Sequence, residues 1–404
     1  MRWRQPLAYY WRTTCALHPS PSLIHWFVAV DKSPCPRRRR GLVPGIGLSE
    51  VSTLSPDKGV HAFLSSEAPS VAVRNGRART YAALDLGTNN CRLLVARPTA
   101  DGFRVIDAFS RIVRLGEGLS LTGRLSEAAI ARTLEALRVC RDKMVARGVT
   151  RARTIATEAC RSAANGMSFV DEVRERLGIE LEIVDRETEA HLAAAGVGDL
   201  ADRNARSIVM FDIGGGSSEI IWLRADDRSP RHAREVRAWE SLRLGVVSLA
   251  EKFGGVDVSE ETFAAMTDDV AEALAPFVAR VADETRCSRF HLLGTSGTVT
   301  TIAGVHLNLR RYDRRAVDGL WLGREQVDGA VARLRSMSYA ERAANACIGQ
   351  DRADLVLAGC AVLEAIRRHF PAERLRIADR GLREGILSQM MREDGVGPHR
   401  RRWR

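Results

Sequence analysis

The sequence predicts a two-domain α/β protein with mixed sheets and a cleft between the domains. Two stretches carry this prediction, Ala83–Asn90 and Met210–Ser218, because each has an apolar run, then Asp-apolar-Gly, then small polar residues. Another apolar run follows each stretch, which indicates a buried strand, a glycine turn and a return strand. The aspartates Asp85 and Asp212 lie 127 positions apart (212 minus 85). This repeat indicates a duplicated fold.

Strands and helices alternate after the first hairpin, which is typical of an α/β domain. Ser126 is expected to begin a helix that ends at Gly148, because apolar residues recur at helical spacing between them. The other expected elements of this half are short strands around 104–114, strands at 152–156 and 181–184, a helix at 169–177 and a helix from Thr188.

The second half is expected to repeat this alternation, with helices dominating after residue 297. Its expected strands are 208–213 with a hairpin partner, 241–244, 290–293 and 375–378, and its main expected helices are 260–284, 354–369 and one from Leu382. Because each half begins with a glycine hairpin, the two halves are expected to place these hairpins at one shared cleft.

Composition divides the chain further. Residues 1–78 are proline-rich and serine-rich, contain Arg37–Arg40 and lack sustained periodicity, so we expect a disordered basic extension. Residues 79–205 and 206–394 are the two expected domains, and residues 395–404 form a basic disordered tail. The extension either gathers polyanions or adds nothing to the function.

The formal net charge of +11 is concentrated at the two ends of the chain. Residues 1–80 hold 12 basic and 4 acidic residues and residues 395–404 hold four arginines, which leaves residues 81–394 at −1. Nucleic acid is therefore expected to contact only the basic tails, and without specificity.

The eight cysteines are scattered and form no Cys-x-x-Cys pair, so neither a zinc site nor a disulfide framework is expected. We expect reduced core thiols and a cytoplasmic location. The longest uncharged apolar run near the start, Leu23–Val30, is too short to span a bilayer, so no membrane association is expected.

The two glycine turns are candidate phosphate-binding loops, since such turns aim backbone N–H groups into one concavity. Asp85 and Asp212 at the strand ends are suited to a magnesium ion held through its waters. The candidate phosphate ligands are Gly87, Thr88 and Asn89 in the first turn, and Gly214, Gly215, Gly216 and Ser217 in the second.

Two glutamates are the candidate catalytic residues. Hydrolysis of a phosphoanhydride needs an aligned water and a carboxylate that orients or deprotonates it. Glu189 lies at the start of an expected helix and Glu219 follows the glycine turn, so both are expected at the cleft. Spacing alone leaves Glu187 open as an alternative.

Two further motifs are expected at the cleft. Thr157, Arg161 and Asn165 are spaced four apart, so a helix would place them on one face, where Arg161 could neutralise a phosphate chain. A third small-residue turn ends a strand and opens a helix, whose N-terminus suits phosphate or a nucleotide sugar. Its candidate ligands are Gly294, Ser296 and Gly297.

Taken in order, these motifs resemble the Ppx/GppA (exopolyphosphatase/guanosine pentaphosphate phosphatase) family of the actin/Hsp70/sugar-kinase superfamily. The resemblance covers roughly residues 80–390 and rests on the motifs beginning at Asp85, Thr157, Glu189, Asp212, Arg243, Gly294 and Arg380. It implies two ribonuclease-H-like (actin-like ATPase) domains, and a short form without the C-terminal HD-type domain of longer members.

The resemblance also implies the chemistry. It implies Mg²⁺ dependence, a homodimer, and removal of the terminal phosphate from inorganic polyphosphate, with guanosine pentaphosphate as the alternative substrate. Glu189 matches the family's catalytic base and Glu219 the carboxylate that helps to place the water. Arg161 matches the arginine that faces the substrate, while Asp85 and Asp212 lie at the metal and phosphate loops.

Two rival functions stay open. A sugar or acetate kinase of the same superfamily would need an acceptor pocket and an adenosine site, and the glutamate pair favours hydrolysis instead. A non-catalytic sensor of polyphosphate or of an alarmone would need only the phosphate loops.

Overall fold

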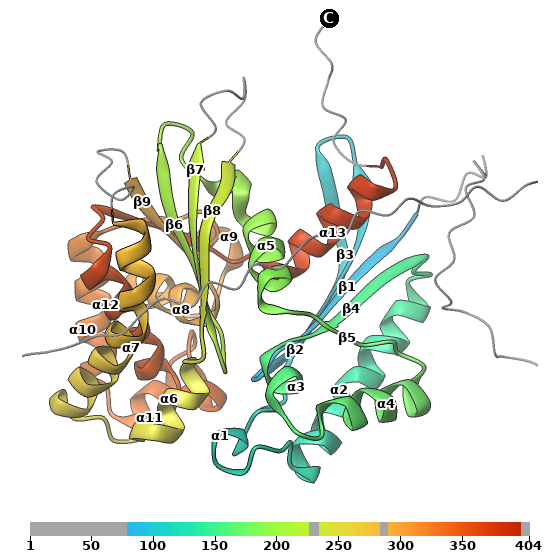
Figure 1. Cartoon of the computed structure of the whole chain (residues 1–404), viewed down its shortest axis with the longest axis horizontal. Helices are drawn as coiled ribbons and strands as arrows, with labels where there is room; N and C mark the ends of the chain where they lie inside the picture. Colours follow the sequence, from blue (N-terminus) through green and yellow to red (C-terminus); the bar gives the residue numbers. More distant parts are fainter. Residues whose placement is uncertain (1–78, 226–233, 283–289, 397–404) are drawn as a thin grey trace, which may run out of the picture. The chain divides into compact units, whose positions relative to one another are not determined.

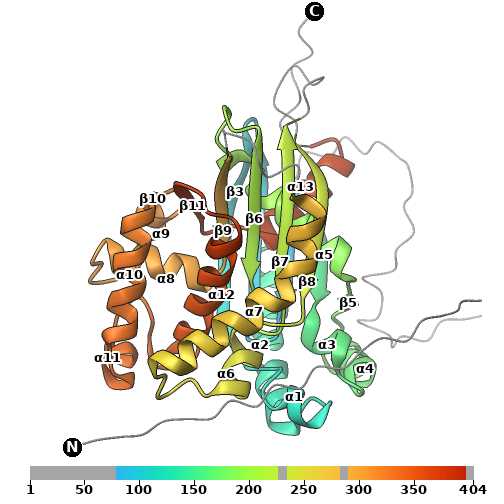
Figure 2. The same ribbon diagram turned by 60° about the vertical axis from the view of Figure 1, so that its left-hand side comes forward.

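The computed structural model describes residues 79–225, 234–282 and 290–396, and these residues form two mixed sheets with helices on both faces of each (Figures 1 and 2). The strand order is β3-β2-β1-β4-β5 in the first sheet and β10-β11-β9-β6-β7-β8 in the second. The central strands β1 and β6 each pair antiparallel with the next strand and parallel with a later one. The predicted fold class is confirmed.

The first half contains a five-stranded sheet and four helices before the chain crosses over. The strands are β1 (Tyr81–Leu86), β2 (Asn90–Thr99), β3 (Gly102–Ile112), β4 (Arg151–Ala156) and β5 (Glu182–Ile183). The helices are α1 (Leu119–Thr122), α2 (Glu127–Ala146), α3 (Glu158–Ser162) and α4 (Gly166–Leu177).

The second half contains a six-stranded sheet. The strands are β6 (Ser207–Ile213), β7 (Ser218–Ala225), β8 (Arg234–Leu242), β9 (Phe290–Thr295), β10 (Trp321–Gly323) and β11 (Arg374–Ala378). The helices are α5 (Arg186–Val197), α6 (Val246–Phe253), α7 (Glu260–Val281), α8 (Gly297–His306), α9 (Arg314–Val317), α10 (Arg324–Ser336), α11 (Tyr339–Ala344), α12 (Val356–His369) and α13 (Leu382–Glu393). Two 3₁₀ turns, η1 (Gly198–Leu200) and η2 (Gln350–Arg352), complete the elements.

Buried residues on both faces of β1 and β6 explain why these strands are apolar over most of their length. In β6, Val209 and Phe211 pack on the side of α7 and α12, whereas Ile208 and Met210 pack on the side of α5. Successive side chains of a strand point to opposite faces, so a strand covered on both sides reads as a continuous apolar run.

Helices α5 and α13 are exchanged between the two halves. The alanines of α5 pack against β6 and β7 of the second sheet. Helix α13, the last element, packs against β1 and β2 of the first sheet. The two helices meet closely, because a Cβ on Gly385 would lie 1.9 Å from the carbonyl oxygen of Leu192. The division into domains at residues 205 and 206 stays a prediction, and this exchange qualifies it.

Several predicted boundaries need correction. The short strands predicted around 104–114 are one strand, β3. The strand predicted at 241–244 ends at Leu242 and begins at Arg234. Helix α5 begins two residues before Thr188, because Asp185 accepts a hydrogen bond from the Thr188 N–H and caps the helix. The helix from Ser126 is confirmed, since the Ser126 hydroxyl caps α2.

Other predictions lie partly outside the described residues. These are the basic extension 1–78, most of the tail (397–404) and the predicted end of α7 at Glu284. Five cysteines are described, and all five are buried free thiols: Cys91, Cys140, Cys160, Cys347 and Cys360. In the part of the chain that is described, no helix has the length and apolar character needed to cross a bilayer.

Candidate active site

Both glycine turns line one cleft, which has a volume of about 630 Å³. We name Gly87–Asn90 the first glycine loop and Gly214–Ser217 the second glycine loop. Most of the predicted site residues line this cleft: Asp85, Gly87, Thr88, Asn89, Glu189, Asp212, Gly214, Gly215, Gly216, Ser217, Glu219, Ser296 and Gly297. Two predicted residues, Arg161 and Gly294, are not among the lining residues.

The first glycine loop is held from behind by the segment that follows β3. The Gly87 N–H closes the turn on the carbonyl oxygen of Asn90 at 2.9 Å. Val113 and Gly116 then donate their N–H groups to the carbonyl oxygens of Asn89 and Thr88, each at 2.9 Å. With the carbonyl groups engaged on this side, the loop is fixed as a rigid wall of the cleft.

The second glycine loop lies directly against the first. A Cβ on Gly215 would lie 3.0 Å from the Thr88 Cβ, and one on Gly216 would lie 2.8 Å from the Thr88 hydroxyl oxygen. Any larger residue would therefore push the loops apart. The glycine triplet is explained by this close approach as well as by the turn.

Glu219 stands at the start of β7, opposite Asp212 in the β6–β7 ladder. Its side chain is buried, and its Oε1 accepts hydrogen bonds from the hydroxyl groups of Ser217 and Ser241 at 2.8 and 2.9 Å. Burial raises the pKa of Glu219. The two hydroxyls fix the direction of this carboxylate.

Glu189 lies in the first turn of α5 and is also buried. Burial raises the pKa of Glu189 well above its ordinary value, and the negative charge of Glu219 adds to this effect. Arg161 donates to the Glu189 Oε2 at 3.1 Å and acts in the opposite direction. A carboxylate with a raised pKa is suited to take a proton near neutral pH.

Arg161 makes contacts that sequence reasoning did not foresee. Its guanidinium donates to Glu158, to Glu189 and to the carbonyl oxygen of Val184. The prediction that Thr157, Arg161 and Asn165 share one helical face is wrong for Asn165, because α3 ends at Ser162. The Asn165 side chain instead accepts a hydrogen bond from the Leu125 N–H.

The third predicted turn begins α8 as expected, but its residues differ in placement. Ser296, with φ of 109°, caps the helix by accepting from the Thr298 N–H at 3.3 Å. Gly294 lies in β9, and a Cβ there would lie 2.6 Å from the Phe211 ring. Glycine at this position is thus explained by core packing.

Asp85 and Asp212 line the cleft near the ends of β1 and β6. Burial raises the pKa of Asp85, and burial together with Glu219 raises the pKa of Asp212 to about 7. The amide oxygens of Asn89 and Asn90 are buried without a hydrogen-bond partner. A divalent cation would stabilise the ionised form of the two carboxylates, and its waters could donate hydrogen bonds to the two amide oxygens. Mg²⁺ suits such a site because it prefers oxygen ligands.

The described residues contain no group of three or more His, Cys, Asp or Glu side chains placed to hold a metal ion. Asp85 and Asp212 could therefore supply only part of a coordination shell. This fits Mg²⁺, which usually keeps several waters and binds through one or two carboxylates together with substrate phosphates.

Five arginines outside the predicted site line the cleft: Arg314 and Arg380, which are paired, and Arg92, Arg352 and Arg383. Burial lowers the pKa of Arg352 and of Arg383, and the positive charge of Arg92 adds to both effects. Within the described ranges, the guanidinium groups of Arg92, Arg352 and Arg383 have no hydrogen-bond or ion-pair partner. Unpaired cations in a cleft are suited to bind an anionic ligand. Arg92 could have been found from the repeat, because it follows Asp85 by the same seven positions as Glu219 follows Asp212.

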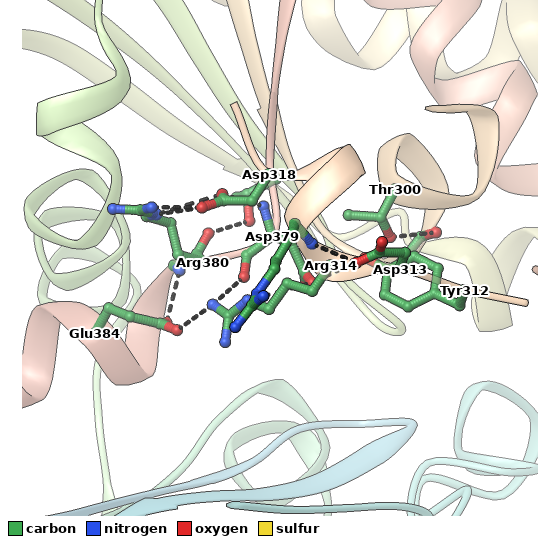
Figure 3. Close-up of polar contacts among 12 residues, drawn as sticks. Thr300, Tyr312, Asp313, Arg314, Asp318, Asp379, Arg380 and Glu384 are labelled. Carbon is green, nitrogen blue, oxygen red and sulfur yellow. Dashed lines mark hydrogen bonds and ion pairs between the residues drawn. The ribbon is translucent and has the colours of Figure 1, made fainter. Parts of the chain in front are cut away.

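A polar network holds the segment from which Arg383 reaches the cleft (Figure 3). Tyr312 donates to Asp379 at 2.8 Å, and Arg314 donates to Glu384 at 3.0 Å. Asp318 accepts from the N–H of Asp379 at 3.0 Å and from Arg380. The network fixes the connection between β11 and α13, where the chain passes from one sheet to the other.

Comparison with known proteins agrees with this geometry. The model of the Ppx/GppA phosphatase family matches residues 94–394. The chain belongs to the Ppx/GppA phosphatase family. The family match covers both halves and most of the residues that line the cleft.

Three proteins illustrate the similarity in sequence. The chain is 31% identical over 322 residues to exopolyphosphatase 2 of Mycobacterium tuberculosis, covering 76% of this chain and 96% of that protein. It is 29% identical to a putative exopolyphosphatase of Haemophilus influenzae, covering 77% and 91%. It is 27% identical to the guanosine-5'-triphosphate,3'-diphosphate pyrophosphatase of Photobacterium profundum, covering 79% of this chain but only 60% of that protein.

Solved structures show the same fold. The Aquifex aeolicus Ppx/GppA family member has a TM-score of 0.64 and 26% identity, with 79% of this chain and 99% of that chain covered. The exopolyphosphatase from Cytophaga hutchinsonii has a TM-score of 0.70 and 24% identity, covering 79% and 99%.

Proposed function

We propose that this protein is an exopolyphosphatase that hydrolyses the terminal phosphoanhydride of inorganic polyphosphate and releases orthophosphate. One observation carries the proposal: two buried glutamates, Glu189 and Glu219, line the same cleft as two glycine loops and three unpaired arginines. A phosphate-binding site alone does not require buried carboxylates, whereas hydrolysis requires a group that activates water. The names of the relatives support the same activity.

In this proposal, the chain's own residues bind the polymer end and activate the water. The glycine loops and the arginines hold the phosphate oxygens by charge-assisted hydrogen bonds. Glu219 orients the water, and Glu189 takes its proton on Oε1, because Oε2 is engaged by Arg161. The water oxygen attacks the terminal phosphorus in line, and the bond to the bridging oxygen breaks with its electrons leaving on the shortened chain.

Mg²⁺ is part of the proposal as the cofactor, with Asp85 and Asp212 as the residues that would hold its waters. When bound, the ion would act as a Lewis acid on the phosphate oxygens. The two carboxylates with raised pKa and the orphaned amide oxygens support this assignment.

Guanosine pentaphosphate is the second candidate substrate. The printed name of the Photobacterium relative supports it, and so does a cleft of about 630 Å³ with apolar wall residues such as Leu94 and Leu382. Here the enzyme would remove the terminal 5'-phosphate by the same chemistry.

Location and assembly complete the proposal. The five buried free thiols support a reducing, cytoplasmic location. The homodimer and the absence of specific nucleic-acid binding stay predictions.

The test is phosphate release from long polyphosphate, short polyphosphate and guanosine pentaphosphate, compared by kcat/KM with and without Mg²⁺. We expect release without any acceptor molecule, which a kinase would not give, and loss of release when Mg²⁺ is chelated. Glu189→Gln should lower kcat by about 10²- to 10⁴-fold while polyphosphate binding is kept. Near-normal turnover of this variant would overturn Glu189 as the base, and binding without turnover in the wild type would favour the sensor.

A further inference from the structure

We propose that Glu158 is a positioning residue that holds Arg161 against Glu189 and so orients the base. The inference rests on the proposed function, since it concerns the step in which Glu189 takes a proton. Glu158 is the first residue of α3 and is 6% exposed, although it lines the cleft. Buried carboxylates are rare unless paired, so its partners need an explanation.

Glu158 is shared by two arginines. Its Oε2 accepts from the Arg161 Nε at 3.1 Å and from the Arg161 Nη2 at 2.7 Å. The Arg186 Nη2 donates to both carboxylate oxygens at 2.9 Å, and the Ser162 hydroxyl donates to Oε1. These contacts lower the pKa of Glu158 despite its burial, so it is ionised at neutral pH.

The Arg161 guanidinium also contacts the base, through the Nη2 that donates to Glu158. Its Nη1 donates to the Val184 carbonyl oxygen at 2.6 Å, and its Nη2 donates to the Glu189 Oε2 at 3.1 Å. The four groups thus form a chain in which charges alternate: Arg186, Glu158, Arg161 and Glu189. Because Glu158 and Val184 engage Arg161 at both ends, the guanidinium cannot turn away from Glu189.

Glu158 acts through Arg161 and not on the substrate directly. It is an anion in a cleft that binds a polyanion, so it has no favourable contact to offer to phosphate oxygens. Its side chain also lies against the second glycine loop, since a Cβ on Gly216 would lie 3.2 Å from the Glu158 Cγ. This contact brings the chain of charges up to the loop that faces the substrate.

The first experiment is steady-state kinetics of Glu158→Gln with polyphosphate and Mg²⁺. We expect kcat to fall about 10- to 100-fold because Arg161 loses an ionic anchor. We expect KM to stay the same or fall, because an anion has been removed from the cleft. Glu158→Asp keeps the charge and should recover part of the lost kcat. A rise in KM with unchanged kcat would overturn the inference.

The second experiment is a double-mutant cycle with Arg161→Gln. If Glu158 acts through Arg161, then Glu158→Gln should add little further loss of kcat in the Arg161→Gln background. Losses that simply multiply would show that Glu158 acts independently, which contradicts the inference.

Arg186→Gln tests the same row of alternating charges at a residue that does not line the cleft. This variant should lower kcat by a few-fold without raising KM. It replaces the Glu158 variants as the test if those variants do not fold.

Glu182→Gln is the matched control. Glu182 pairs with Arg153 at 2.9 Å in the same half of the molecule, but its side chain is half exposed and does not line the cleft. It should leave both kcat and KM unchanged. A wild-type protein that releases no phosphate would overturn the proposed function and this inference together. An active wild type with a fully active Glu158→Gln would overturn this inference alone.

Discussion

The two glycine hairpins have the same backbone plan, but the residue that stands opposite the strand-end aspartate differs between them. In the β1–β2 hairpin Asp85 stands opposite Arg92, and in the β6–β7 hairpin Asp212 stands opposite Glu219. One scaffold therefore presents a cation on one side of the cleft and a buried carboxylate on the other. Under the proposed function, the first hairpin would contribute to substrate binding and the second to water activation.

In both hairpins, a neighbouring segment donates backbone N–H groups to the carbonyl oxygens of the glycine loop. We call this supporting segment the brace. Val113 and Gly116 support the first glycine loop, and Val246 and Val247 donate to the carbonyl oxygens of Gly214 and Gly215 at 3.0 and 2.8 Å.

Both braces also contact the opposite half of the molecule: the Gly118 N–H donates to Glu251 of α6 at 2.8 Å, and Arg114 pairs with Asp354. The Arg114 contact is bidentate, with both distances at 2.9 Å.

Removing the carboxylate of the second hairpin should have the largest effect. Glu219→Gln should lower kcat by about 10²-fold or more, since the water loses one of two orienting carboxylates. In the proposed mechanism Glu189 must be deprotonated, so activity should be lost as pH falls through its pKa. Because the charge of Glu219 helps to raise that pKa, the acid limb of the pH–rate profile should move to lower pH in this variant.

Glu240→Gln is the control for this prediction, because Glu240 lies on the neighbouring strand β8 and pairs with Arg280 outside the cleft lining. It should change neither kcat nor the pH profile. If Glu219→Gln raised KM and left kcat unchanged, the proposal that the first hairpin binds substrate and the second activates water would be refuted.

Removing the cation of the first hairpin should mainly weaken binding. Arg92→Gln should raise KM for polyphosphate about 10- to 100-fold, the loss of one charge-assisted hydrogen bond, with a smaller change in kcat. Higher ionic strength should reduce the difference from wild type. Arg104→Gln on β3, an exposed position, is the control. A purely kcat-based loss in Arg92→Gln would argue that both hairpins serve the chemical step.

The bracing glycines should differ in how well they tolerate alanine. A Cβ on Gly245 would lie 2.4 Å from the Gly215 carbonyl oxygen, which is backbone, whereas one on Gly116 would lie 2.3 Å from a methyl group of Thr88. A side chain moves more easily than a loop backbone. Gly245→Ala should therefore lower the free energy of unfolding by about 2–3 kcal/mol and Gly116→Ala by about 1 kcal/mol.

Urea denaturation measures this difference. Gly329→Ala is the control, because Gly329 lies within α10 with nothing near its Cβ position, and alanine there should stabilise the protein by about 0.5–1 kcal/mol. Equal losses of unfolding free energy for Gly116→Ala and Gly245→Ala would show that the Thr88 side chain and the Gly215 backbone yield equally to an added methyl group.

Loss of the ion pair between Arg114 and Asp354 should have the smallest effect. Asp354→Asn removes the charge that faces Arg114, a partly exposed pair, and should cost about 1 kcal/mol of unfolding free energy. Asp268→Asn, which breaks the exposed pair with Arg368, should cost less than about 0.5 kcal/mol. Equal losses of unfolding free energy in the two variants would mean that the Arg114–Asp354 pair stabilises the protein no more than an ordinary surface ion pair does.

The sequence was sufficient wherever the signal is local. The hairpins, the helix cap at Ser126 and the clustering of Glu189 with Glu219 follow from short patterns of polarity and glycine. The contacts of Arg161 could not be predicted, because spacing alone does not tell whether an arginine faces substrate or a buried carboxylate such as Glu158. Arg352 and Arg383 were missed for a related reason: each reaches the cleft from a segment more than 250 residues after the first glycine loop.

The exchange of α5 and α13 has a consequence for how the chain is made. One face of the first sheet is covered by residues 382–393, the last helix described. Until that helix has been synthesised, Tyr81, Ala83 and Leu94 lack the α13 side chains that pack against them, and the core of the first half is incomplete. A chain truncated before residue 382 would therefore leave this face of the first sheet without the apolar side chains of α13.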